Sequence, residues 1–211
     1  MLLDNFYCLT INDTRFNYLC DIFEKYGLPR PIKHIGFRNP EKSEQYCLFG
    51  HMSLLLMARC LDLPYIFIFE DDAYPRKDVR EKLEFYIENR PKDCGILVLG
   101  RNGESGQIGK FGDYHIVYER PFGAHAYLVY KIAYTELLNS MEKTRIADIA
   151  LRGDNFKESN PYWTNEYLFI QKNLDSNCMS KNLVNKYGRY FYPKSNGGLG
   201  VFSCLPSGNW E

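Results

Sequence analysis

Three acidic side chains, Glu70, Asp71 and Asp72, follow directly after five apolar residues in the segment YIFIFEDDAYP. Burial of the apolar run at 65–69 contributes about 10 kcal/mol, at about 2 kcal/mol for each large side chain. Such a run is typical of a central strand that is covered on both faces. The acidic cluster is therefore expected at the carboxyl end of a buried strand, where its charges could bind a ligand.

The spacing of these acids indicates what they could bind. If the extended geometry persists, Glu70 and Asp72 lie on one side of the backbone and Asp71 lies on the other. Two carboxylates about 6.5 Å apart repel by about 2.5 kcal/mol at an effective dielectric constant of about 20, so a divalent cation is favoured. Oxygen ligands predict Mg²⁺ or Mn²⁺ rather than zinc, because no thiolate or imidazole lies beside the acids. The alternative is a solvated acidic turn in which Asp72 or Asp78 caps the next helix.

Length and charge limit the class of protein. A chain of 211 residues with this apolar content is expected to form one domain with its own core. Lysine plus arginine equals aspartate plus glutamate, at 26 each. Nucleic-acid binding usually leaves a strongly basic footprint, so no nucleic-acid partner is expected.

The cysteines and the apolar runs indicate where the protein works. The seven cysteines are odd in number, and they include no C-x-x-C pair. Together with the lack of a secretory leader, this pattern favours a reducing, cytoplasmic compartment, and we assign none of the cysteines to catalysis or metal. The longest uncharged apolar-rich run, 45–58, has 14 residues, too few to cross a bilayer. We therefore expect a soluble or at most peripheral protein.

Strands and helices alternate over the first hundred residues. The patterns predict strands at 5–11, 31–37, 65–69 and 94–99, and helices at 14–26, 43–61 and 78–89. Asp13 is expected to open the first helix, and Asp78 with Glu81 resembles a capping box. This order predicts a mostly parallel sheet with helices on both faces. Ligands bind beyond the carboxyl ends of such strands, so Asn12 and the acidic triplet would face one crevice.

The second half of the chain gives weaker patterns. Glycine recurs at every third position from 100 to 112, which predicts a mobile loop, either a lid or an ordinary connection. Strands are expected at 114–119 and 124–130, where they add an antiparallel part to the sheet, and a helix is expected at 132–143. Residues 174–211 are rich in Asn, Ser, Lys and Gly, so we expect a loosely ordered tail or an acceptor-facing segment.

Four segments, in order, resemble glycosyltransferase family 25, the bacterial lipooligosaccharide galactosyltransferases with collagen-modifying relatives. YCLTINDTRFNYL resembles the family's first strand and arginine-bearing helix, with Asn12 and Arg15 at matching positions. CLFGHMSLLLMA, with Cys47 and His51, resembles its cysteine-to-histidine segment. FIFEDDA resembles its acidic metal motif, and GAHAYLVYKIAYTELL resembles a later strand and helix. IADIAL is a weaker fifth match, and it places Asp148 where the family often has an aspartate.

The resemblance implies a single GT-A-like (Rossmann-like) α/β domain over 1–211, with a nucleotide-sugar-binding core at about 5–172. It also implies a UDP-sugar donor, of which UDP-galactose is the first candidate. The implied metal is Mn²⁺ or Mg²⁺, and the implied reaction inverts the configuration at the anomeric carbon. The implied acceptor is a saccharide, lipid-linked at the inner face of the cytoplasmic membrane, in lipooligosaccharide or lipopolysaccharide biosynthesis.

The resemblance also implies roles for single residues. Glu70 and Asp72 would bind the metal or lie next to it, and Asp148 would be the catalytic base, with Asp154 as the second candidate. The residues assigned to the donor and its phosphates are Asn12, Arg15, His51, Asp71 and His125.

Plainer interpretations of these positions remain open. Arg15 could instead pair with Asp13 on the helix surface. His51 and His125 could be hydrogen-bonded structural histidines. The aromatic residues of the 162–167 segment could stack on an acceptor sugar or belong to the core.

Two other functions compete with glycosyl transfer. A metal-dependent phosphohydrolase or nuclease also uses acids at strand ends, although such enzymes usually need further acids or histidines around the ions. A non-catalytic nucleotide-sugar-binding module would keep the fold without turnover, and the sequence does not separate it from an enzyme.

Overall fold

The protein is built on an eight-stranded sheet in the order β2-β1-β3-β10-β5-β11-β8-β7. The computed structural model describes residues 3–36, 43–100, 103–104, 108–118, 121–171, 191–193 and 199–201. In sheet order, the strands are Ile32–Ile35 (β2), Phe6–Thr10 (β1), Tyr65–Glu70 (β3), Ala126–Tyr130 (β10), Cys94–Val98 (β5), Asn160–Thr164 (β11), Tyr114–Val117 (β8) and Ile108–Phe111 (β7).

The strand directions confirm a mixed, mostly parallel sheet. Strand β1 is parallel to β2 and β3, and β5 is parallel to β11. Strand β10 is antiparallel to both β3 and β5, and β8 is antiparallel to both β11 and β7. Only β8 and β10 therefore run against the other strands of this sheet.

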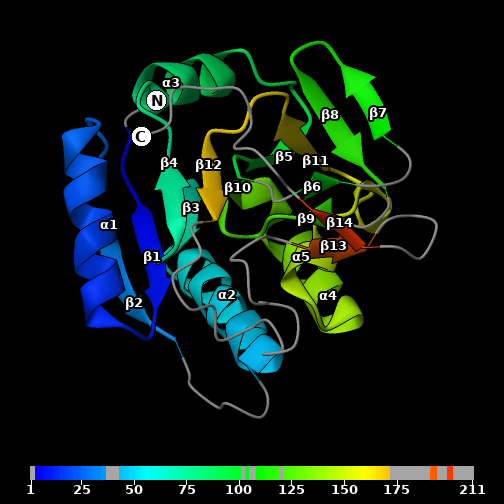
Figure 1. Cartoon of the computed structure of the whole chain (residues 1–211). Helices are drawn as coiled ribbons and strands as arrows, with labels where there is room; N and C mark the ends of the chain where they lie inside the picture. Colours follow the sequence, from blue (N-terminus) through cyan, green and yellow to red (C-terminus); the bar gives the residue numbers. More distant parts are fainter. Residues whose placement is uncertain are drawn as a thin grey trace.

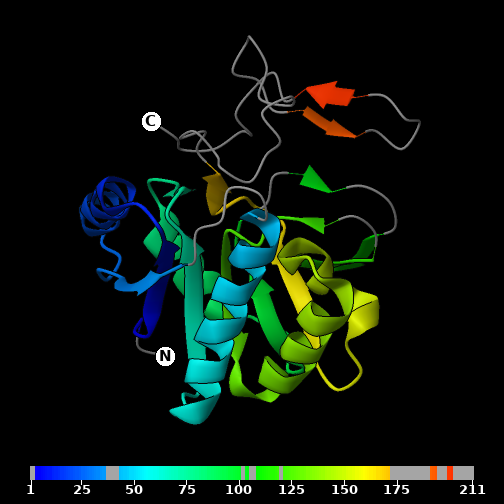
Figure 2. The same cartoon turned by 90° about the horizontal axis from the view of Figure 1, so that it is seen from below.

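Helices cover both faces of the sheet, as the sequence predicts. Helices α1 (Asp13–Lys25) and α3 (Val79–Glu88) pack on one face. Helices α2 (Ser43–Cys60), α4 (Tyr134–Thr144) and the short α5 (Ala147–Ala150) pack on the other. Figure 1 and Figure 2 show α2 and α4 side by side on this second face. Two single-turn 3₁₀ helices, Lys131–Ala133 and Gly153–Asn155, flank this layer.

Strand β3 supplies both halves of the core. Phe67 and Phe69 belong to the core on the α1 side, and Ile66 and Ile68 belong to the core on the α2 side. All four side chains are fully buried, as expected for a central strand whose alternate side chains face opposite sides of the sheet.

Among the described residues, no helix is both long enough and apolar enough to cross a membrane.

Three short strand pairs lie outside the main sheet. Strand β4 (Ala73–Pro75) pairs antiparallel with β12 (Phe169–Gln171), which brings a late part of the chain to the acidic turn. Strand β6 (Gly103–Glu104) pairs with β9 (Pro121–Phe122). Strand β13 (Phe191–Pro193) pairs with β14 (Leu199–Val201).

The two predicted helix caps are wrong. Helix α1 begins at Asp13, and its cap is Asn12, whose side chain accepts hydrogen bonds from the backbone nitrogens of Thr14 and Arg15 at 3.0 and 3.1 Å. Asp78 precedes α3 but makes no side-chain cap, because its carboxylate is paired with Arg76. The capping box is therefore absent at α3.

The glycine-rich segment at 100–112 is not a loop throughout. It contributes β6 and the edge strand β7, and Gly112 turns the chain between β7 and β8 with a φ of +61°. The remainder of the expected lid, at 101–102 and 105–107, lies outside the described residues, as does the expected tail at 174–211 apart from β13 and β14.

Candidate active site

The segments that carry the predicted site residues meet at one edge of the sheet. Strands β1 and β3 end there together, with Leu9 paired to Glu70. Strand β10 runs the other way and therefore begins at this edge, where the backbone nitrogen of Glu70 donates to the carbonyl of His125 at 2.9 Å. The acidic cluster thus lies at the carboxyl end of a buried strand, as predicted.

Arg15 binds the two aspartates of the cluster. Its Nη2 lies 2.6 Å from Asp71 Oδ1 and 3.0 Å from Asp72 Oδ2. Thr10 Oγ1 donates to Asp71 Oδ2 at 2.6 Å, and Gln171 Nε2 donates to Asp72 Oδ2 at 3.0 Å. Charge-assisted contacts of this length are strong where water is largely excluded, so both aspartates are held firmly.

One oxygen of this arrangement is left without a partner. Asp72 Oδ1 is buried and makes no hydrogen bond among the described residues. Burial raises the pKa of Asp72 to about 7, and the charge of Glu70 adds to the rise. A buried carboxylate oxygen without a partner is costly in free energy. A divalent cation would supply the missing contact, so the Asp72 site fits the Mg²⁺ or Mn²⁺ ion predicted from the sequence.

The predicted placement of the three acids is partly wrong. Glu70 and Asp71 do lie on opposite sides of the backbone, but Asp72 shares Arg15 with Asp71 instead of joining Glu70. The reason is that β3 ends at Glu70 and the chain turns at 71–72, so the alternation of an extended strand stops there. Asp13 pairs with Lys33 and not with Arg15, which binds the two aspartates.

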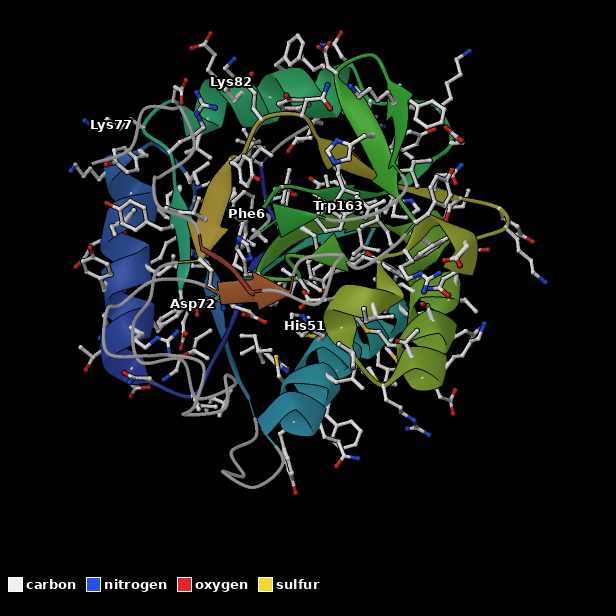
Figure 3. The ribbon with its side chains drawn as sticks, turned by 45° about the vertical axis from the view of Figure 1, so that its right-hand side comes forward. Phe6, His51, Asp72, Lys77, Lys82 and Trp163 are labelled. Carbon is white, nitrogen blue, oxygen red and sulfur yellow. The ribbon has the colours of Figure 1, made fainter. Side chains whose placement is uncertain are left out.

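Glu70 faces α2 and contacts a cysteine and a histidine. Its Oε1 lies 3.4 Å from Cys47 Sγ and 3.1 Å from His51 Nε2, and His51 Nδ1 lies 2.9 Å from the hydroxyl of Tyr127. The expectation that no thiolate or imidazole lies beside the acids is therefore wrong, because α2 packs against the end of β3. Figure 3 shows His51 on α2 and Asp72 on the side of α1.

The charge of Glu70 is stabilised by this contact. Burial acts to raise the pKa of Glu70, but the hydrogen bond and charge of His51, together with His125 and Cys47, outweigh it, so the pKa is lowered overall. Glu70 therefore stays ionised near neutral pH, whereas Asp72 is close to its titration point. Unequal environments of this kind are typical of functional sites, although ion-pair networks produce them too.

His125 lies in a tight, dry position at the same edge. Its Nε2 is 3.4 Å from the carbonyl oxygen of Phe169, and its buried Nδ1 has no partner among the described residues. Burial lowers the pKa of His125 to about 4, so the ring is neutral at pH 7. The ring packs on Gly100, where an added Cβ would lie 2.3 Å from Nε2. The backbone at 100 therefore has to be glycine for His125 to keep this place.

Asn12 has a structural task in addition to any role with a ligand. Its side-chain oxygen caps α1 through two backbone nitrogens, one of which belongs to Arg15. Asn12 is exposed just beyond the end of β1. The cap also fixes the first turn of α1, from which Arg15 reaches the acidic turn.

Asp148 holds the loop that leads into β10. Its Oδ1 accepts hydrogen bonds from the backbone nitrogens of Gly123 at 2.9 Å and Ala124 at 2.7 Å. Burial raises the pKa of Asp148 despite these two bonds. A raised pKa makes a carboxylate a stronger base near neutral pH, so the environment suits the predicted role. Asp154, the second candidate, is exposed and paired with Arg152.

The aromatic residues at 162–163 cannot form a platform for an acceptor sugar. Trp163 is fully buried near His115, with ring centroids 6.4 Å apart. Tyr162 is also buried, packs against Tyr114, and donates its hydroxyl to Asp93. The core interpretation of these two side chains is therefore correct.

Sequence reasoning missed several residues that shape the site. Thr10 could have been found, because it is the last residue of the first strand and lies at the expected edge. Gln171 gave no signal, since it lies 99 positions from Asp72 along the chain. Gly100 and Tyr127 act through their contacts with the two histidines, which only the folded chain reveals.

The fold and this acidic edge together define a GT-A-like α/β protein. A solved structure with the same fold is a glycosyltransferase involved in the glycosylation of the major capsid of PBCV-1. The alignment covers 82% of this chain and 93% of that chain, with a TM-score of 0.52 and 9% sequence identity. No protein-family model matches the sequence, and no curated protein matches it. Membership of family 25 therefore stays a prediction, whereas the fold class is confirmed.

Proposed function

We propose that this protein is a metal-dependent inverting glycosyltransferase that moves a hexose from a UDP-sugar to a saccharide acceptor. Galactose is the hexose that we propose to be transferred. The observation that carries the proposal is the buried, unpartnered Oδ1 of Asp72 at the carboxyl edge of the sheet. The structural neighbour supports it, because that protein is itself described as a glycosyltransferase and has the same fold.

The charges at the edge favour a divalent cation. Glu70, Asp71 and Asp72 carry three negative charges when ionised, and Arg15 compensates one of them, which leaves a net charge of −2. Asp72 would hold the ion through Oδ1, and Glu70, whose charge acts on Asp72, would lie next to it. Mg²⁺ and Mn²⁺ match such oxygen ligands. When bound, the ion would neutralise charge that develops on the departing diphosphate.

The donor would be held by residues around this ion. Asn12 and Arg15 lie at the start of α1, and a helix N-terminus favours anionic groups such as phosphate. Asp71 would contact the ribose or the sugar. His125 is neutral, and its unpartnered Nδ1 can take part in a hydrogen bond with an oxygen atom of the UDP-sugar. His51 would act through Glu70, since both of its nitrogens are already engaged.

Asp148 would act as the base in the transfer. Its Oδ1 is occupied by the amides of Gly123 and Ala124, so Oδ2 would take the proton from the acceptor hydroxyl. That hydroxyl oxygen forms a bond to the anomeric carbon while the bond from the same carbon to the phosphate oxygen breaks. UDP leaves with the bonding electrons, and the configuration at the anomeric carbon is inverted.

The acceptor part of the proposal rests on the resemblance to family 25. It implies a lipid-linked saccharide at the inner face of the cytoplasmic membrane, in lipooligosaccharide or lipopolysaccharide synthesis. The chain would then meet the membrane only at its surface.

The experiment is a product assay. The full chain is incubated with Mn²⁺, UDP-galactose or other UDP-hexoses and a panel of saccharides, and UDP release and product mass are measured. We expect one UDP for each hexose transferred, no activity in Asp72→Asn, and full activity in Cys60→Ser, which changes an exposed cysteine. Phosphate release from simple esters without UDP formation would indicate a phosphohydrolase. UDP binding without transfer to any acceptor would indicate a binding module.

A further inference from the structure

We propose that Cys47, His51 and Glu70 form a binding site for a transition-metal ion, Zn²⁺ above all, on the α2 side of β3. The proposal does not rest on glycosyl transfer, because two of its three ligands, Cys47 and His51, lie outside the Asp72 site. Glu70 is the single residue that both sites would share.

The three side chains come from two elements that pack against each other. Cys47 and His51 are four residues apart on α2, so they project from the same face of that helix. Glu70 ends β3 and points toward this face. The possible ligand atoms of the three residues all lie within 4.8 Å of one another. A pair of ligands on one helical turn with a third from a neighbouring strand is a sound basis for a metal site.

The distances are close to those that a tetrahedral zinc ion needs. Typical zinc bond lengths separate a nitrogen and an oxygen ligand by about 3.3 Å, and a sulfur and an oxygen ligand by about 3.6 Å. In the protein, His51 Nε2 lies 3.1 Å and Cys47 Sγ lies 3.4 Å from Glu70 Oε1. An expansion of about 0.2 Å in each of these two contacts would match the spacing of zinc ligands. The ligand atoms of Cys47 and His51 lie within 4.8 Å of each other.

The surroundings of the cluster suit a metal centre. The hydroxyl of Tyr127 lies 2.9 Å from His51 Nδ1 and fixes the orientation of the imidazole. Such a partner on the second ring nitrogen is usual for histidines that bind metals. His51 is fully buried, whereas Cys47 and Glu70 are half-buried, so the cluster is backed by protein and open on one side. A fourth position would be left for water or a ligand oxygen.

The ligand types set the preference among ions. A thiolate and an imidazole favour zinc and similar ions, whereas Mg²⁺ and Ca²⁺ prefer sites made of oxygen alone. The competing explanation is a hydrogen-bonded group that merely positions Glu70. The two explanations differ in whether Cys47 binds an ion, which can be measured without any substrate.

Zinc affinity gives the first test. The full chain, freed of metal with a chelator, competes with a chromophoric chelator for Zn²⁺. We expect one ion whose affinity falls more than about tenfold in Cys47→Ser and in His51→Gln, since each change removes a ligand. Cys60→Ser, a matched change of an exposed cysteine at the end of the same helix, should keep the wild-type affinity. Equal zinc affinity in the wild type and in a folded Cys47→Ser would overturn the proposal.

Cobalt substitution gives a second test that does not depend on how the variants fold. Co²⁺ bound to the wild-type protein should show a thiolate-to-cobalt charge-transfer absorption in the near ultraviolet. The band should persist in Cys60→Ser and disappear in Cys47→Ser. Absence of the band in the wild type would overturn the proposal, even if Cys47→Ser failed to fold.

Discussion

The guanidinium of Arg15 lies 2.6 Å from the carboxylate of Asp71 and joins a helix on one face of the sheet to the turn that follows its central strand. The same nitrogen reaches Asp72 at 3.0 Å. The three side chains are at most 15% exposed, so the charges face one another with little water between them. Arg15 thus places a positive charge inside the acidic cluster.

Removal of the Arg15 guanidinium should destabilise the fold. Arg15→Met leaves two largely buried carboxylates without their partner, and we expect a loss of roughly 3 kcal/mol in the free energy of unfolding. Arg15→Lys keeps the charge and should lose less. Urea denaturation measures both values.

The matched control is Arg80→Met. Arg80 forms an exposed pair with Glu84 at 3.2 Å, and its loss should change stability by no more than about 0.5 kcal/mol. Equal effects at Arg15 and Arg80 would show that the pair at the acidic turn contributes no more than a surface pair.

The close approach of His125 to Gly100 should be visible in a double-mutant cycle. Gly100→Ala places a methyl group 2.3 Å from His125 Nε2, so we expect a loss of about 1–3 kcal/mol from overpacking. In the His125→Ala background the same change should cost much less, because the ring is gone. Additive effects of the two substitutions in thermal or urea unfolding would contradict the contact.

Glu136 should make stability depend on pH in the acid range. Its carboxylate accepts hydrogen bonds from the backbone nitrogens of Lys157, Glu158 and Ser159 and from the hydroxyl of Ser159. Burial acts to raise its pKa, but these bonds outweigh it and hold the pKa below the usual 4.5. The contribution is therefore complete above pH 4.5 and is lost as the pH falls through the lowered pKa.

The measurement is urea denaturation of the wild type and Glu136→Gln at several pH values. At pH 7 we expect the variant to be less stable by about 1–2 kcal/mol, because hydrogen bonds to a charged acceptor are replaced by weaker ones. The difference should shrink as the pH falls below 4.5 and through the lowered pKa of Glu136. A difference that stays constant from pH 7 to pH 3 would exclude this role.

Asp148→Asn should separate catalysis from binding. The asparagine oxygen can still accept from Gly123 and Ala124, so the loop before β10 should hold its place. Loss of the base should lower kcat by about 10²–10⁴-fold, while the affinity for UDP with Mn²⁺ changes little. Asp154→Asn is the control and should keep the wild-type rate. An unchanged kcat in Asp148→Asn would exclude it as the base.

Much of the fold was predictable because its signals are local. The run at 65–69 indicates a strand buried on both faces, and it is the central strand β3. The apolar face of α1 follows a helical period that the sequence shows directly. The antiparallel direction of β10 was predicted and is confirmed. Its position between β3 and β5 was not predicted, because strand order depends on contacts between distant segments.

The site was predictable in its residues but not in its contacts. The acids, Arg15 and His51 stand in recognisable segments, and the structure brings them to one edge. Which of them pair was hidden, because the pairing depends on a turn after Glu70 and on the packing of α2. For the same reason Asp72 was expected with Glu70, whereas it shares Arg15 with Asp71.

The most direct test of the proposed function is calorimetric titration of UDP into the full chain, with and without Mn²⁺, for the wild type and Asp72→Asn. We predict that the wild type binds UDP at one site only when Mn²⁺ is present, and that a folded Asp72→Asn does not. UDP binding that is independent of Mn²⁺, or that is unchanged in Asp72→Asn, would contradict a cation at the unpartnered oxygen of Asp72.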